Sequence, residues 1–126
     1  MSRHGYPEAD WERAKAEMRT VLVHVAGTPD GFISYAELVA RVSAITFEPR
    51  DQRLWYMLRE ISSEENAAGR GMLTAVVRHA HGDMMPGTGF FELARALGYD
   101  PKDELEFWLG QVRIVREKWG GGRPGA

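Results

Sequence analysis

The sequence predicts a mostly α-helical fold of the α+β kind, with five helices and one small β-hairpin. Three observations indicate this class. Apolar residues recur at three- and four-residue spacing along most of the chain, and capping motifs precede several of those stretches. One stretch, residues 72–80, alternates between apolar and polar positions and is bounded by glycines. The length of 126 residues suits one globular domain, expected over 1–119, with a disordered tail over 120–126.

The first helix is predicted over residues 8–25. Its apolar side chains share one helical face, and charged side chains occupy the opposite face. Gly27 and Pro29 end this helix, and the "TPDG" stretch that contains Pro29 has the composition of a turn. The next residues, "FIS", are long enough only for a strand stub. The apolar face consists of Trp11, Ala14, Met18, Val21, Leu22 and Val25.

Two further helices are predicted before residue 67. The "SYAE" stretch is a capping box, in which the Ser34 hydroxyl accepts the Glu37 backbone N–H and the Glu37 carboxylate accepts the Ser34 N–H. The helix that begins there is short, because Ser43 and β-branched residues follow. After Pro49, helical spacing over 51–66 predicts a longer helix with Leu54, Leu58 and Ile61 facing inward.

The second half of the chain is predicted as strand, turn, helix, helix. Residues 72–80, "MLTAVVRHA", form the expected strand, and "HGDMMPGTG" forms the turn. A helix then begins near Gly89 with Thr88 as its cap and ends at Gly98. The last helix is expected to have Asp100 as N-cap and Pro101 as its first residue. Its predicted buried stripe is Leu105, Trp108, Leu109, Val112 and Val115.

This order of elements is that of a winged-helix domain with two extra C-terminal helices. The helix over 51–66 would then be the recognition helix, and the hairpin after residue 72 would be the wing. The prediction rests on element order alone, since no signature motif accompanies it.

Two stretches, "ISYAELVARV" and "GRGMLTAVVRHAHGDMMPGTGFFELARALG", resemble small bacterial proteins with no assigned activity. Those proteins share an "ITYGELA"-like helix start and a "LSAVVV…G.PG.GFF.LA" segment, and the resemblance covers about forty positions. The first stretch also resembles the "YGELA" helix in the winged-helix half of alkylguanine transferases. Their "PCHR" nucleophile motif is absent here, so the resemblance implies a domain family and no reaction.

The composition argues against several classes of protein. There are no cysteines, so disulfides, thiol nucleophiles and cysteine-bound zinc are excluded. No apolar run reaches the length of about 18 residues that a membrane span needs, and the N-terminus lacks the apolar core of a signal peptide. We therefore expect a cytoplasmic protein without a membrane partner. No cofactor motif is found, and no catalytic residue is assigned.

Four arginines are the predicted nucleic-acid-binding residues. Arg50, Arg53 and Arg59 belong to the helix over 51–66 and its start, and Arg78 belongs to the predicted wing. The first hypothesis is thus a DNA-binding, non-enzymatic module. The balance of 16 basic against 18 acidic residues lowers this expectation, because nucleic-acid binding draws on excess positive charge. Acidic residues on the same helix equally predict a solvated, ion-paired face.

A second hypothesis places a small-ligand site in the loop before the fourth helix. In this hypothesis the loop binds phosphate or a nucleotide. Alternatively, the protein is a metal-dependent hydrolase whose metal is bound by the H-x-H-x-D array that ends at Asp83. The structural alternative, favoured for this loop, is a turn and a helix cap. The predicted ligand-binding residues are His79, His81, Gly87, Thr88 and Gly89.

A third hypothesis is a protein-interaction domain. Trp55, Tyr56, Trp108 and Trp119 offer more aromatic surface than a small core needs. If Trp55 or Trp119 is exposed, a protein partner or self-association through these aromatic residues is expected.

Overall fold

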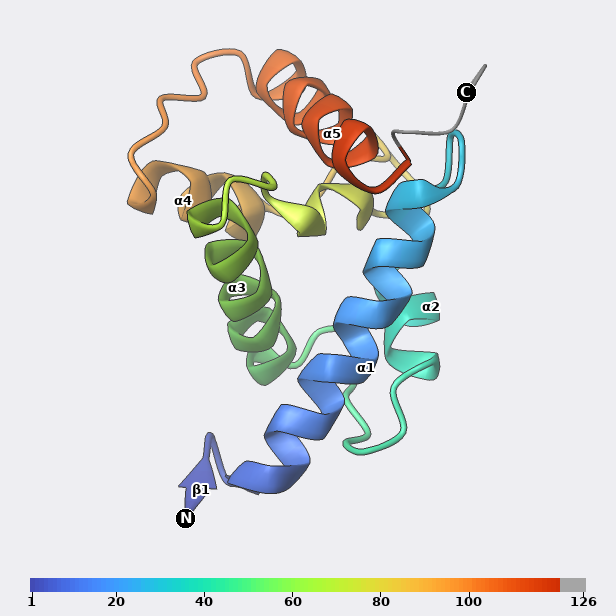
Figure 1. The fold of residues 1–126 in the computed structure, drawn as a ribbon, viewed down its shortest axis with the longest axis vertical. Helices are drawn as coiled ribbons and strands as arrows, with labels where there is room; N and C mark the ends of the chain where they lie inside the picture. Colours follow the sequence, from blue (N-terminus) through green and yellow to red (C-terminus); the bar gives the residue numbers. More distant parts are fainter. Residues whose placement is uncertain (121–126) are drawn as a thin grey trace.

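Residues 1–120 are described by a computed structural model, in which they form five α-helices, one 3₁₀ helix and a two-stranded antiparallel sheet (Figure 1). The predicted mostly helical class is therefore confirmed, and a small antiparallel sheet is present, although it lies at residues 2–7 and not after residue 72. In chain order the elements are β1 (Ser2–Arg3), β2 (Tyr6–Pro7), α1 (Glu8–Gly27), α2 (Tyr35–Ala40), α3 (Gln52–Ala67), the 3₁₀ helix η1 (Leu73–Val76), α4 (Thr88–Ala96) and α5 (Glu104–Gly120).

The long helix α1 runs along the molecule and organises the other elements. Helix α5 packs near its C-terminal end, α3 lies on the same side of α1 in this view, and α2 lies on the other side (Figure 1). The 3₁₀ helix η1 contacts α1, α3 and α5, and α4 packs against α3. Among the described residues, no helix has both the length and the apolar character needed to cross a membrane.

Two hydrophobic clusters meet at η1. The larger cluster joins α1, α2 and α3, and it includes the fully buried Trp11. The smaller cluster lies under α4 and α5 and includes the buried Trp108. Leu73 and Val76 point into the first cluster, whereas Met72 and Ala75 belong to the second. This short segment therefore separates the two cores and contributes side chains to both.

The predicted strand over 72–80 is wrong: residues 73–76 form η1, and within the predicted range only Val77 takes part in a β-bridge. Three backbone groups of this segment are paired by side chains from distant elements, and the Val76 carbonyl accepts the Ile33 N–H at 2.9 Å. The Met72 N–H donates to Gln111 Oε1 at 3.0 Å, and the Thr74 N–H donates to Ser62 Oγ at 3.0 Å. The Trp108 indole N–H donates to the Ala75 carbonyl at 2.7 Å. These bonds satisfy a fully buried segment without a ladder.

Only a fragment of strand pairing survives beyond η1. Val77 forms an isolated parallel bridge with Ile33, the residue of the predicted strand stub. The sheet of the described chain is instead the N-terminal hairpin, in which Arg3 pairs with Tyr6 across a turn at His4 and Gly5. The wing expected after residue 72 is not formed, so the winged-helix layout is not confirmed.

Helix starts agree with the sequence in the first half of the chain. Both hydrogen bonds of the capping box are present at α2, and Asp51 caps α3 by accepting the Arg53 N–H at 2.8 Å. Helix α4 begins at Thr88, with Gly87 rather than Thr88 as N-cap.

Helix α5 departs more from its prediction. It begins at Glu104 and not at Pro101, and Asp103 instead of Asp100 accepts a first-turn N–H, that of Glu106. Leu105 and Leu109 of the predicted buried stripe are exposed. Gly120 belongs to α5, and residues 121–126 of the predicted disordered tail lie outside the described residues.

Candidate ligand site between α3 and α4

A cavity of about 250 Å³ lies between the first half of α3 and the start of α4. Buried apolar side chains make up much of its wall, and several polar groups also face it. Six of the nine site residues predicted from the sequence line this one cavity: Arg50, Arg59, His79, Gly87, Thr88 and Gly89. The remaining lining residues are Tyr35, Pro49, Asp51, Gln52, Leu54, Trp55, Leu58, Thr74, Val77, Phe90 and Leu93.

Trp55 forms one wall because residue 89 is a glycine. A Cβ atom at Gly89 would lie 1.7 Å from Nε1 of the Trp55 indole and 2.3 Å from its Cδ1. The indole therefore packs directly on the backbone of the first turn of α4. On the indole itself, the Arg59 guanidinium lies 5.3 Å from the ring centroid. Gly89 thus allows a close approach, and Trp55 is the residue that requires it.

Polar groups converge at the other end of the cavity. The Gly87 N–H donates to the Tyr35 hydroxyl at 2.9 Å, and the Tyr35 ring lies against the His79 imidazole with 5.3 Å between centroids. Burial raises the pKa of the Tyr35 phenol, against the lowering effect of the hydrogen bond from Gly87. Tyr35 therefore stays protonated and retains an O–H that is free to donate.

The four predicted arginines do not form one surface. Arg50 and Arg59 are exposed and line the cavity. Arg53 is instead bound through two nitrogens to Asp51, with its guanidinium 4.7 Å from the centroid of the Tyr6 ring. Arg78 lies away from the cavity, stacked 3.9 Å from the centroid of Phe32.

The loop with the H-x-H-x-D array closes as a turn. The His79 N–H donates to the Met85 carbonyl at 2.9 Å, and the Met85 N–H donates to Asp83 Oδ1 at 3.0 Å. His81 is exposed and does not line the cavity. No cluster of three or more His, Asp or Glu side chains suited to a metal ion occurs within residues 1–120. The array therefore offers no ligand set for the metal-dependent hydrolase alternative.

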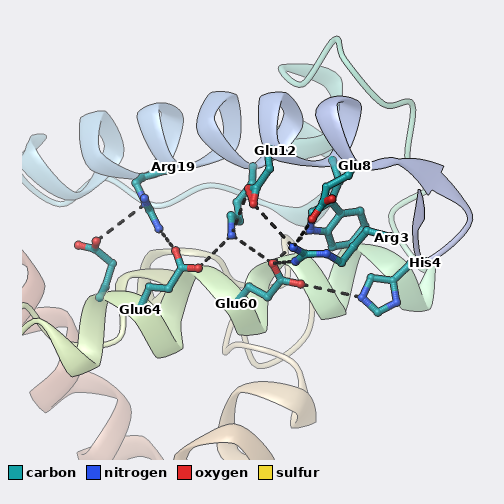
Figure 2. Close-up of polar contacts among 10 residues, drawn as sticks. Arg3, His4, Glu8, Glu12, Arg19, Glu60 and Glu64 are labelled. Carbon is teal, nitrogen blue, oxygen red and sulfur yellow. Dashed lines mark hydrogen bonds and ion pairs between the residues drawn. The ribbon is translucent and has the colours of Figure 1, made fainter. Parts of the chain in front are cut away.

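The acidic residues of α3 are paired with bases from elsewhere in the fold. Lys15 is buried and donates to Glu60 Oε1 at 3.2 Å and to Glu64 Oε2 at 2.9 Å. Arg3 donates to Glu60 at 3.2 Å, and Arg19 donates to Glu64 (Figure 2). Burial opposes the charge of Lys15, but its bonds to the two carboxylates raise the pKa of the lysine overall. This face of α3 is therefore an ion-paired contact with α1 and not a free binding surface.

The tryptophans are mostly accounted for by packing. Trp11 and Trp108 are buried in the two cores, and Trp55 and Trp119 are each half-buried. Arg70 stacks on Trp119 with 5.9 Å to the centroid. The two half-buried indoles thus already have neighbours within the chain.

Sequence reasoning missed Tyr35 as a site residue and named Trp55 only as an aromatic of uncertain exposure. The sequence signal near Tyr35 was the capping box, which makes Tyr35 the first residue of α2 but does not indicate what its side chain contacts. The pairing of Trp55 with Gly89 had no sequence signal, because the residues belong to different helices.

The chain matches no known protein-family model, no curated protein and no solved structure.

Proposed function

We propose that this protein binds a small organic anion, a carboxylate or phosphate ester with an apolar group, in the cavity between α3 and α4. The observation that carries the proposal is the combination of an apolar floor with two arginines that have no acidic partner among residues 1–120. Binding, and not catalysis, is the activity proposed.

The floor of the cavity suits the apolar part of such a ligand. Leu54, Leu58, Val77, Phe90 and Leu93 are all buried and line the cavity. Ligand pockets typically combine an apolar lining with a few polar groups, and usually measure about 300–1,000 Å³. A volume of about 250 Å³ therefore suits a molecule with a single ring or a short chain.

The charge of the lining favours an anion. The acidic residue of the lining, Asp51, is neutralised by Arg53 and by the N-terminus of α3, and the hydrogen bonds from Arg53 lower the pKa of its carboxyl group. Arg50 and Arg59 carry no such partner. Guanidinium groups bind carboxylates and phosphates through two parallel hydrogen bonds, so either arginine can hold the charged end.

Nucleic-acid binding is the competing proposal for the same arginines. It is supported by the exposure of Arg50, which precedes α3, and of Arg59, which lies in the middle of α3. It is weakened by Arg53 and Arg78, which are engaged with Asp51 and Phe32. A winged-helix interpretation would use all four arginines, whereas the cavity proposal uses two.

Calorimetric titration with matched probes tests the proposal. Benzoate, hexanoate and phenyl phosphate are compared with benzyl alcohol, which lacks the charge, and with inorganic phosphate, which lacks the apolar group. We expect binding of at least one amphipathic anion and weaker binding of both control compounds. A random DNA duplex, titrated at several salt concentrations, identifies the competing function by a steep loss of affinity with salt.

Two variants locate the site. Arg59→Gln removes one charge from the cavity and should weaken binding roughly tenfold, as expected for a lost hydrogen bond to a charged group. Leu93→Phe adds volume to the floor and should block binding, with circular dichroism confirming the fold. Arg41→Gln removes an exposed arginine outside the lining and should change nothing. Equal effects of Arg59→Gln and Arg41→Gln, or no binding of any anion, would overturn the proposal.

A further inference from the structure

Helix α5 presents an outward face that the rest of the described chain leaves uncovered. Its opposite side packs on α1 and η1, so this face lies at the edge of the molecule (Figure 1). Leu105, Leu109 and Ile114 are between 42% and 51% exposed, and they account for half of the large exposed hydrophobic residues in residues 1–120. By helix geometry Leu105 and Ile114 lie on opposite sides of α5, and Leu109 lies between them on the outward side. Leu109 is therefore the apolar side chain that a partner on this face would contact.

A glycine lies in the middle of the same face. Gly110 belongs to the interior of α5, where glycine weakens a helix relative to alanine. A Cβ atom at this position would have no atom within 4 Å, so packing within the chain does not require a glycine. A second helix that approaches closely at this point would require it.

Two opposite charges flank the glycine along the helix. Glu106 and Arg113 are seven residues apart, which places them two turns apart on the same line of the helix surface. Both are exposed, and neither side chain has an ion pair or hydrogen bond within the described chain. The midpoint between them falls between Leu109 and Gly110.

We propose that α5 pairs with α5 of a second copy of this chain, antiparallel, about a twofold axis beside Leu109 and Gly110. In an antiparallel twofold pair each residue lies opposite the residue of the second copy that is equally far beyond the axis, so Glu106 of each copy faces Arg113 of the other. The two ion pairs form together on either side of the axis. Leu109 meets Leu109 of the second copy, and Gly110 allows the helices to come close. A parallel arrangement would instead place like charges together.

The expected complex is weak. One pair of helices buries less area than the roughly 1,200–2,000 Å² of a standard stable interface, so the dimer should form only at high protein concentration. Rim-exposed ion pairs contribute more to specificity than to affinity, which makes charge reversal the informative change. This proposal is independent of the cavity, and either can fail without the other.

Sedimentation equilibrium over a range of protein concentrations tests it, with four charge variants. Glu106→Arg alone places arginines opposite arginines, and Arg113→Glu alone places glutamates opposite glutamates, so each should dissociate at least tenfold more readily. An equimolar mixture of these two variants restores both ion pairs in a heterodimer and should recover association. Glu48→Arg and Arg41→Glu make the same charge changes at exposed positions outside α5 and should associate like the unmodified chain.

The mixture distinguishes a specific pairing from general effects of charge or folding. Circular dichroism establishes that both single variants keep their helical content. The proposal is overturned if the unmodified chain stays monomeric at the highest concentration, if the single variants associate normally, or if their mixture fails to associate.

Discussion

The contact between Trp55 and Gly89 gives the sharpest prediction about stability. In Gly89→Ala the new methyl group would lie 1.7 Å from Nε1, 2.3 Å from Cδ1 and 2.8 Å from Cε2 of the indole. Ordinary contacts between such atoms are about 3.5–4.0 Å, so the ring must retreat by about 2 Å. Overpacking of this kind costs about 1–3 kcal/mol.

Gly110→Ala is the matched control, because both glycines lie within helices. Alanine is preferred over glycine in a helix by about 0.5–1 kcal/mol, and only Gly89→Ala meets an obstacle. We therefore expect Gly110→Ala to stabilise the chain slightly and Gly89→Ala to destabilise it by about 1–2 kcal/mol. Urea denaturation in dilute solution, followed by tryptophan fluorescence, measures both changes.

A double-mutant cycle shows whether the indole is the cause. In a Trp55→Ala background the obstacle is gone, so Gly89→Ala should become stabilising, as Gly110→Ala is. The reasoning is refuted if Gly89→Ala has the same effect in both backgrounds, or if it is as stable as Gly110→Ala in the unmodified chain.

Three further predictions concern charged groups. Arg116 donates to backbone carbonyls at the end of α1 and in the following turn. Arg116→Gln should therefore lower the free energy of unfolding, measured by urea denaturation, by about 2 kcal/mol. Arg113 has no such bonds, so Arg113→Gln should leave the free energy of unfolding almost unchanged in dilute solution. Lys15→Met leaves two carboxylates of α3 without their buried partner and should lower stability by roughly 2 kcal/mol, with a smaller loss at high salt. Hydrogen bonds from Ser43 and the next backbone N–H lower the pKa of Glu17. This stabilisation is present above the ordinary pKa of about 4.5 and is lost as the pH falls through the lowered value, so thermal denaturation of Glu17→Gln should vary less with pH in that acid range.

Local chemistry could be predicted from the sequence because its partners are close along the chain. The capping box joins Ser34 and Glu37, which are three positions apart, and both of its hydrogen bonds are present. The predicted start of α5 was wrong although its partners are also close along the chain: Asp100 and Asp103 both precede the helix, and Asp103 is the one that accepts a first-turn N–H.

The segment after Gly71 could not be predicted, since the partners of its backbone come from far along the chain. Gln111, Ser62 and Trp108 provide the groups that replace a strand ladder. Alternation of apolar and polar residues predicts a strand only when the polar positions face solvent. Here Thr74 is buried against Ser62, so the alternation does not mark an exposed face.

The candidate site has one part that the sequence predicted and one part that it could not predict. Loop composition singled out Gly87, Thr88 and Gly89, which do line the cavity. The side chains that contact this loop, Trp55 at Gly89 and Tyr35 at Gly87, depend on how α3 and α2 approach it. Such an approach is decided by packing in three dimensions, which the spacing of residues in one chain does not reveal.

The position of η1 between the two cores has a consequence for unfolding. Because consecutive residues of one turn belong to different clusters, neither cluster can lose its packing while that turn keeps its native backbone. The α4–α5 region and the α1–α3 region should therefore melt together, in a single calorimetric transition whose van't Hoff and measured enthalpies agree. Slow amide exchange should extend through residues 72–77 at the rate set by global unfolding. A four-residue turn would then determine the cooperativity of the whole described chain.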